Sequence, residues 1–139
     1  MDGDITAISS ADAMGIVEST RTTGAIPGYD LTEFEPKTIF DVMTREGPCV
    51  VVIVDPDEAE VAVHGMFEPF GEPTLATFFG ASIGGDTRIG WILEGAQLNF
   101  EMANGDIVLT PIVLSVLKPR EDDDEEADRV IAEARRRLS

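Results

Sequence analysis

His64 and Cys49 are two side chains of reactive type, each the single representative of its kind in this sequence of 139 residues. A histidine can act as a general base or complete a metal site with carboxylates, and a cysteine thiolate is a nucleophile. The two could face each other across a predicted hairpin, but Cys49 heads the apolar run 49–54 and no third group can be assigned that would orient the pair. We interpret Cys49 as a small buried hydrophobic residue and His64 as a surface or hydrogen-bonded structural residue.

Four acidic residues follow this apolar run, at Asp55, Asp57, Glu58 and Glu60. Carboxylate oxygens are the ligands that Ca²⁺ and Mg²⁺ prefer. The spacing departs from that of an EF-hand loop, because Glu60 occupies the position of the required glycine and the distal glutamate is missing. A solvated acidic turn is therefore the favoured interpretation.

The glycine-rich stretch 80–85 is the remaining motif that suggests a ligand. No Lys-Ser/Thr pair follows it, so it is not a phosphate-binding loop, and it does not match the dinucleotide-binding pattern either. We interpret it as a hinge or hairpin loop. Nothing in the spacing of the 27 acids selects one pair for acid–base catalysis. The sequence thus predicts no catalytic residue, no cofactor and no metal ligand, and we expect a protein that is not an enzyme.

The charge balance restricts the partners of the chain. Ten basic residues against 27 acidic residues give a net charge of −17, which repels phosphate backbones and anionic lipid surfaces. We therefore expect neither nucleic acid nor a membrane as a partner. Lys37 and Lys118 are the only lysines. Adaptation to high salt and a GC-rich genome that favours arginine codons both account for this composition, and the sequence leaves the choice open.

The start of the chain has neither the basic nor the apolar region of a signal peptide, and no apolar stretch reaches the roughly 18 residues of a membrane span. We expect a cytoplasmic protein, or one incorporated into a virion-like particle assembled there. The length predicts a single domain over 1–139. Residues 1–35 could form an extended N-terminal arm, in which a helix from about 9 to 17 and a strand over 15–20 are alternatives.

Short apolar segments bounded by turn residues dominate the rest of the chain. They predict a mainly β (α+β) fold, an antiparallel β-sandwich or barrel. Pro36 and an apolar stripe from Ile39 to Met43 predict a short helix over 36–45 that ends at Gly47-Pro48. The expected strands are 49–54, apolar on both faces, then 60–64, 75–79, 88–93, 97–102 and 107–117.

Two turns and one helix complete the prediction. Asn104-Gly105 is a strong signal for a hairpin with a type I′ turn. Pro111 interrupts the return strand and marks an edge position or a bulge. An acidic run leads into a C-terminal amphipathic helix over 121–138, with arginines at its end to match the helix dipole. Its apolar stripe must dock on its own sheet or on a neighbouring subunit.

The sequence contains more apolar surface than one small sheet with two flanking helices can cover alone. Phe67 and Phe70 lie on a Pro/Gly loop, where they either fold back to close one end of the sandwich, which is slightly favoured, or contact a partner. The two-faced strand after Pro111 and the helix stripe add to the excess. The interface candidates are Phe67, Phe70, Ile112, Leu114, Val130, Ile131 and Leu138.

We therefore expect a non-enzymatic structural or assembly subunit that forms a homo-oligomer or joins other subunits of an assembly. The most concrete version is a virion component of the tailed-virus type, in the tail tube, the connector or the capsid decoration, by analogy of fold style alone. A small ligand-binding domain or enzyme with a site near His64 and Trp91 is an alternative. A peptide-binding adaptor that adds a strand to a sheet edge near Pro111 is another.

Overall fold

A computed structural model describes residues 28–137 of the chain. These residues form strands, one short 3₁₀ helix, η1 (Leu31–Glu33), and one α-helix, α1 (Asp124–Arg136). The strands are β2 (Gly28–Asp30), β3 (Ile39–Thr44), β4 (Gly47–Asp55), β5 (Glu60–Gly65), β6 (Thr74–Ile83), β7 (Asp86–Ile89), β8 (Trp91–Leu93), β9 (Gln97–Glu101), β10 (Ile107–Leu109) and β11 (Val113–Val116). The predicted arm lies outside the described residues up to position 27, and so do both of its alternatives.

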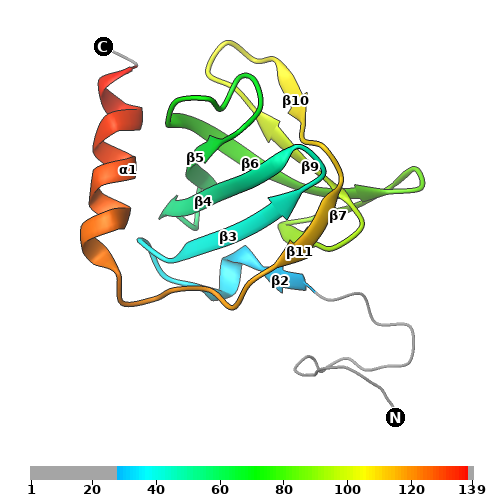
Figure 1. Ribbon diagram of the computed structural model, residues 1–139, viewed down its shortest axis with the longest axis horizontal. Coiled ribbons are helices and arrows are strands. Elements are labelled where there is room, and N and C mark those ends of the chain that lie inside the picture. Colours follow the sequence, from blue (N-terminus) through cyan, green and yellow to red (C-terminus); the bar gives the residue numbers. More distant parts are fainter. Residues whose placement is uncertain (1–27, 138–139) are drawn as a thin grey trace.

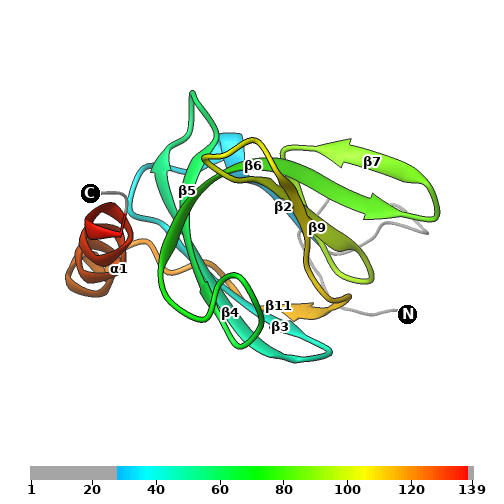
Figure 2. The same cartoon turned by 90° about the horizontal axis from the view of Figure 1, so that it is seen from above.

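The strands pair antiparallel in the order β10-β9-β6-β5-β4-β3-β11, with β7 added beside β6. Because β10 and β11 are successive parts of one segment, the two ends of this sheet meet and the sheet curls into a barrel (Figures 1 and 2). Hydrogen bonds from both sides of that segment close it: the Thr110 N–H donates to the Leu98 carbonyl at 2.9 Å, and the Arg45 N–H donates to the Ile112 carbonyl at 3.0 Å. The predicted mainly β, antiparallel sandwich or barrel is confirmed.

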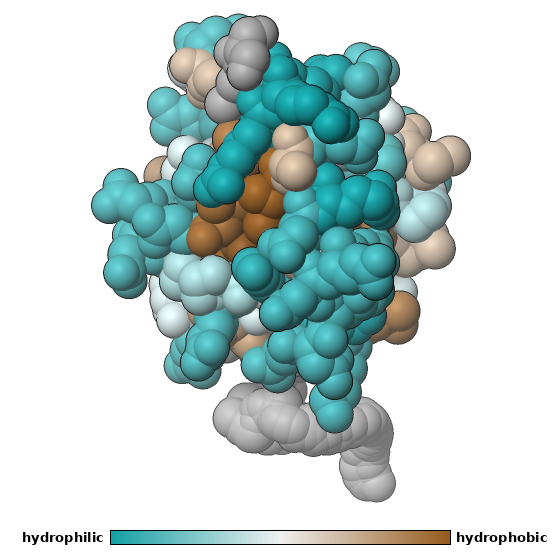
Figure 3. All heavy atoms as spheres, turned by 90° about the vertical axis from the view of Figure 1, so that its left-hand side faces the viewer, coloured by the Kyte–Doolittle hydropathy of each residue, from teal (hydrophilic) through white to brown (hydrophobic). Residues whose placement is uncertain are grey.

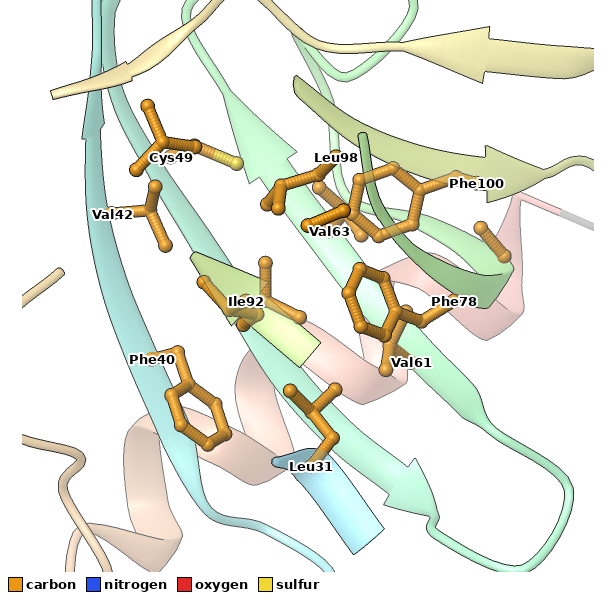
Figure 4. Packing of buried hydrophobic residues seen from close by; sticks show 14 of the residues in the cluster. Leu31, Phe40, Val42, Cys49, Val61, Val63, Phe78, Ile92, Leu98 and Phe100 are labelled. Carbon is orange, nitrogen blue, oxygen red and sulfur yellow. The ribbon is translucent and has the colours of Figure 1, made fainter. Parts of the chain in front are cut away.

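The inward side chains of every second strand position fill the barrel (Figure 4). Each end is closed by a separate segment. The two-stranded sheet of β2 and β8 supplies Ile92 and Leu93 at one end, with Leu31 of η1 beside them. The connection between β5 and β6 folds over the other end and buries Phe67 and Phe70 (Figure 1).

The predicted helix over 36–45 is wrong, because this segment is strand β3. Its apolar positions suit both periods over so short a run, and pairing with β4 decides between them. Phe40 and Val42 point into the barrel, whereas Ile39 points outward beneath α1. The chain does not end a helix at Gly47 but turns tightly there from β3 into β4, and the Thr44 hydroxyl donates to the Gly47 carbonyl at 2.8 Å.

Residues 80–83, expected as part of a flexible link, continue strand β6, and the predicted strand 88–93 is divided at Gly90, whose φ is 81°. Gly84 and Gly85, with φ of 57° and 91°, form the two-residue turn that joins β6 to β7. The hairpin at Asn104-Gly105 is confirmed, but its turn is not type I′. Only Gly105 has a positive φ there, 92°, so a glycine bulge follows an ordinary turn.

Helix α1 covers the outer face of β3, β4, β5 and β6, so β4 is apolar on both faces for a structural reason. Ile39, Val52, Ala62 and Leu75 meet the buried stripe of the helix, which consists of Ala127, Val130, Ile131 and Ala134. In Figure 3, where the helix side faces the viewer, an apolar area is still visible beside the charged residues. The helix is shorter than predicted, and Leu138 lies outside the described residues. No helix within 28–137 is long and apolar enough to cross a membrane.

Candidate functional site

The residues of reactive type are not assembled into a site. Cys49 points into the barrel core with 1% of its surface exposed, and this burial raises the pKa of its thiol to about 12. The thiol therefore stays protonated at neutral pH and is a poor nucleophile. His64 is on β5, where it lies opposite Val50 of β4. Trp91 begins β8, so His64 and Trp91 belong to different sheets. The Trp91 ring is stacked under Arg88, whose guanidinium lies 4.5 Å from the ring centroid.

The described residues offer no ligand pocket of useful size or any metal cluster. Within 28–137, no three His, Cys, Asp or Glu side chains gather in a way that could hold a metal ion. A hollow of about 20 Å³ lies between Leu31, Ile53 and Phe78, space for a single water. A second, of about 210 Å³, is polar and open and is bridged by the ion pair of Arg137 with Glu72 at 2.9 Å.

Arg120 is the centre of a cluster of carboxylates that fastens the start of α1 to β3. Its guanidinium binds both oxygens of Asp41, at 2.8 and 3.0 Å, and its Nη1 contacts Asp123 at 2.9 Å and Glu126 at 3.1 Å. The hydrogen bonds to Asp41, and then the one to Glu126, raise the pKa of Arg120 above its ordinary value. Asp123 also caps the helix. All four groups are used internally, so the cluster is structural.

The substitution Arg120→Gln is expected to lower the free energy of unfolding by about 1–2 kcal/mol, because three carboxylates then lie together without their cation. Urea unfolding at low salt measures the loss, which should shrink as KCl screens the repulsion. Arg129→Gln is the matched control: its ion pairs to Glu126 and Glu133 are exposed, and we expect a change below about 0.5 kcal/mol. Equal losses in the two variants would contradict a structural role for the Arg120 cluster.

Glu94 and Tyr29 lie together at the barrel end that β2 and β8 close. Desolvation raises the pKa of Glu94 above its ordinary value of 4.5, although its carboxylate accepts a hydrogen bond from the Val116 N–H at 3.3 Å. Burial, and then the charge of Glu94, raises the pKa of Tyr29 above 10.0. Both shifts keep the proton on the group, so neither Glu94 nor Tyr29 is poised as a general base.

Glu94→Gln should leave the free energy of unfolding at pH 7 unchanged or raise it by up to about 1 kcal/mol, because the amide keeps the acceptor for Val116 without a partly desolvated charge. A raised carboxyl pKa means that Glu94 stabilises the fold when protonated, and this contribution is lost as the pH rises from 4.5 through the folded value. The advantage of the glutamine should therefore vanish below pH 4.5. Tyr29 is the one tyrosine of the chain, so its absorbance titration reports the charge of Glu94, and the pKa of Tyr29 should fall in the variant. An unchanged tyrosine titration would contradict this charge interaction.

The predicted interface candidates divide into buried and exposed residues. Phe70 is fully buried and Phe67 is 9% exposed, so both fold back into the core, the alternative that the sequence slightly favours. Val130 and Ile131 lie on α1 and are buried between the helix and the chain's own sheet, so these four residues offer no contact to a partner in this conformation. Ile112 is half-buried, and Leu114 is 53% exposed.

Leu114 is one of four exposed apolar side chains along a single segment of the chain, which we together call the exposed wall. It consists of the exposed apolar side chains of one segment: Ile107, Leu109, Leu114 and Leu117, between 51% and 61% exposed. The segment 107–117 contains no charged residue, although 27% of the chain is charged. Its inward residues Val113 and Val116 pack in the core, so the strand is two-faced as predicted, but only one face is covered. Figure 2 shows this segment on the far side of the barrel from α1.

The hairpin of β6 and β7 is a second feature that a self-contained barrel does not need. It projects beyond the ring of strands (Figure 2), and all four residues of β7 are exposed. Phe79 and Ile89 on this hairpin are 50% and 63% exposed. The sequence prediction missed this projection because it treated 80–86 as a link. The available signal was the pair Gly84-Gly85 between two short β-prone segments, which is a hairpin pattern.

Comparisons of this chain with protein-family models, with curated proteins and with solved structures found no match.

Proposed function

We propose that this chain is a non-enzymatic structural subunit that assembles with further copies of itself or with other subunits of a larger particle. The observation that carries the proposal is the exposed wall: four large apolar side chains on an uncharged segment of a chain whose net charge is −17. A monomer that depends on charge for solubility gains nothing from such a surface, whereas a subunit contact does.

The location of the wall supports the same proposal. Helix α1 covers one outer side of the barrel, and the wall lies on another side where no described residue covers it. A neighbouring subunit is the kind of partner that would complete the packing. A virion component of the tailed-virus type, in the tail tube, connector or capsid decoration, is the most concrete form of the proposal and rests on the style of the fold alone.

Light scattering and sedimentation at high protein concentration test the proposal. We expect a defined multiple of the 15.0 kDa chain mass. Leu109→Asp, which puts a charge on the wall, should shift the mass toward the monomer. Ala132→Asp adds the same charge to an exposed position of α1 and should leave the mass unchanged. A wild-type chain that stays monomeric at high concentration and in both low and high salt would overturn the proposal.

The acidic composition predicts that KCl stabilises the chain. With a net charge of −17, self-repulsion is strong at low salt and is largely screened once the Debye length falls to about 3 Å near 1 M salt. The melting temperature should therefore rise with KCl up to about 1 M. A continued rise well above that concentration indicates adaptation to high salt, whereas a plateau indicates screening alone and favours the explanation by codon usage. A melting temperature that does not respond to KCl would contradict both.

A further inference from the structure

We infer that the projecting hairpin pairs with the same hairpin of a second copy, β7 against β7 and antiparallel, about a two-fold axis at Thr87. This inference names a contact surface for the assembly proposed above and rests on that proposal. Residues 80–82 of β6 pair with β9 on one side and with β7 on the other, so the pairing would join β9, β6 and β7 of each copy into one continuous sheet. Strand β7 is suited to it because one edge pairs with β6 and its other edge faces away from the barrel (Figure 2).

The alternation of hydrogen-bonded and non-hydrogen-bonded pairs along the hairpin determines which backbone groups point to the free edge of β7. Ile83 and Asp86 close the two-residue turn, so they form a hydrogen-bonded pair, and such pairs alternate with non-bonded ones along the ladder. Thr87, opposite Ser82, is therefore in a non-bonded position toward β6. Its N–H and carbonyl point to the free edge, and those of Ile89 do the same. Two copies of Thr87 placed opposite each other can exchange two hydrogen bonds.

Charge selects the same register. With Thr87 opposite Thr87 of the second copy, Asp86 lies opposite Arg88, and the symmetry repeats this pair on the other side of the axis. Opposite charges that face each other across an antiparallel pair stabilise it, and like charges destabilise it. Neither Asp86 nor Arg88 forms an ion pair with another residue of the described part of the chain.

The neighbouring registers are less favourable. An axis at Arg88 would place two guanidinium groups opposite each other, and the Arg88 backbone groups already face β6. An axis at Ile89 would place Arg88 opposite Gly90 and leave both charges unpaired. The sequence Asp-Thr-Arg is thus self-complementary in one antiparallel arrangement, which is the requirement for a two-fold contact between identical surfaces.

Oxidative cross-linking through Thr87→Cys tests the arrangement directly. Directly opposite residues of a hydrogen-bonded antiparallel pair have Cα atoms about 5.5 Å apart, within reach of a disulfide. We expect rapid formation of a covalent dimer. Cys49 is buried and should not react, and Asp57→Cys, on an exposed turn, is the control that should cross-link only slowly.

Charge reversal in the Thr87→Cys background then tests the register. Asp86→Arg gives one chain arginine at both positions, and Arg88→Asp gives another chain aspartate at both. Each variant alone should cross-link about tenfold more slowly, because two attractive pairs become repulsive. An equal mixture should recover the original rate and yield the mixed dimer, identified by its mass. Losing the stacking of Arg88 on Trp91 cannot produce this rescue, since the Arg88→Asp chain lacks that contact in the mixture as well.

No rescue on mixing, or equal cross-linking by Thr87→Cys and Asp57→Cys, would overturn the inference. The wild-type mass separates this failure from that of the proposed function. A chain that is oligomeric without cross-linking at Thr87 assembles through another surface, so the proposed function stands and the β7 contact falls. A monomeric chain whose cross-linking follows the charge pattern has the β7 contact but no stable assembly.

Discussion

Phe70→Ala is expected to lower the free energy of unfolding by about 3–5 kcal/mol, the range for removing a fully buried aromatic ring. Phe70 has no exposed surface, and its ring packs edge-on against Phe100 with centroids 5.3 Å apart and against Phe67 at 6.2 Å. The truncation leaves a cavity at the end of the barrel that the connection between β5 and β6 closes. The Phe70 carbonyl keeps its 2.7 Å hydrogen bond from Gly65, so the backbone of the connection cannot easily collapse to fill the space.

Equilibrium unfolding in urea measures this loss. Met66→Ala is the matched control, because Met66 lies in the same connection and is 69% exposed, and we expect a change within about 0.5 kcal/mol. Should both variants lose the same small amount, Phe70 would not be the plug of the barrel end. The mass of the assembly gives a second result. Folded Phe70→Ala should form an assembly with the same number of subunits as the wild type, because a fully buried ring makes no contact with a neighbour.

Val130→Asp is expected to detach α1 and to cost about 3–5 kcal/mol, because it places an unpaired carboxylate against an apolar sheet face. Val130 is 1% exposed and belongs to the stripe that packs on Ile39, Val52 and Leu75. Detachment would uncover the outer face of β4, so the variant should also aggregate more readily than the wild type.

Thermal unfolding followed by circular dichroism, together with hydrogen exchange of β4 and β5, measures the effect. Ala132→Asp introduces the same charge on the exposed side of the helix and should lose only a few tenths of a kcal/mol by comparison. The loss in Val130→Asp should not depend on protein concentration, because the helix docks on its own sheet. A loss that grows on dilution would show that the stripe is completed by a neighbouring subunit instead.

Where local pattern and tertiary pairing agree, the elements could be predicted from the sequence. The alternation of Leu98 and Phe100 with polar residues predicted β9, and both side chains lie in the core. The acidic start and apolar stripe predicted α1, and the run 49–54 predicted a strand covered on both faces. Each signal is a property of adjacent residues, so it survives without knowledge of the partner element.

The sequence prediction was wrong where pairing with a distant strand determines the local structure. The segment around Phe40 and Val42 fits a helix as well as a strand over so few residues, and only the ladder with β4 makes it β3. Gly80 resembles a loop residue, but a Cβ there would lie 2.3 Å from the Arg88 carbonyl oxygen, so the close approach of β7 explains the glycine. That neighbour is eight positions further along the chain, beyond what a local pattern can indicate.

The sequence by itself determined the β-rich class, the amphipathic helix, the excess of apolar surface and the scarcity of reactive side chains, because composition and short-range periodicity carry these properties. Only the tertiary structure decided which apolar residues that excess leaves outside. It folded Phe67 and Phe70 into one end of the barrel and left Leu109 and Leu114 on the exposed wall. Exposure depends on which distant segments meet, and closure of the sheet through 107–116 is a contact between residues far apart in the chain.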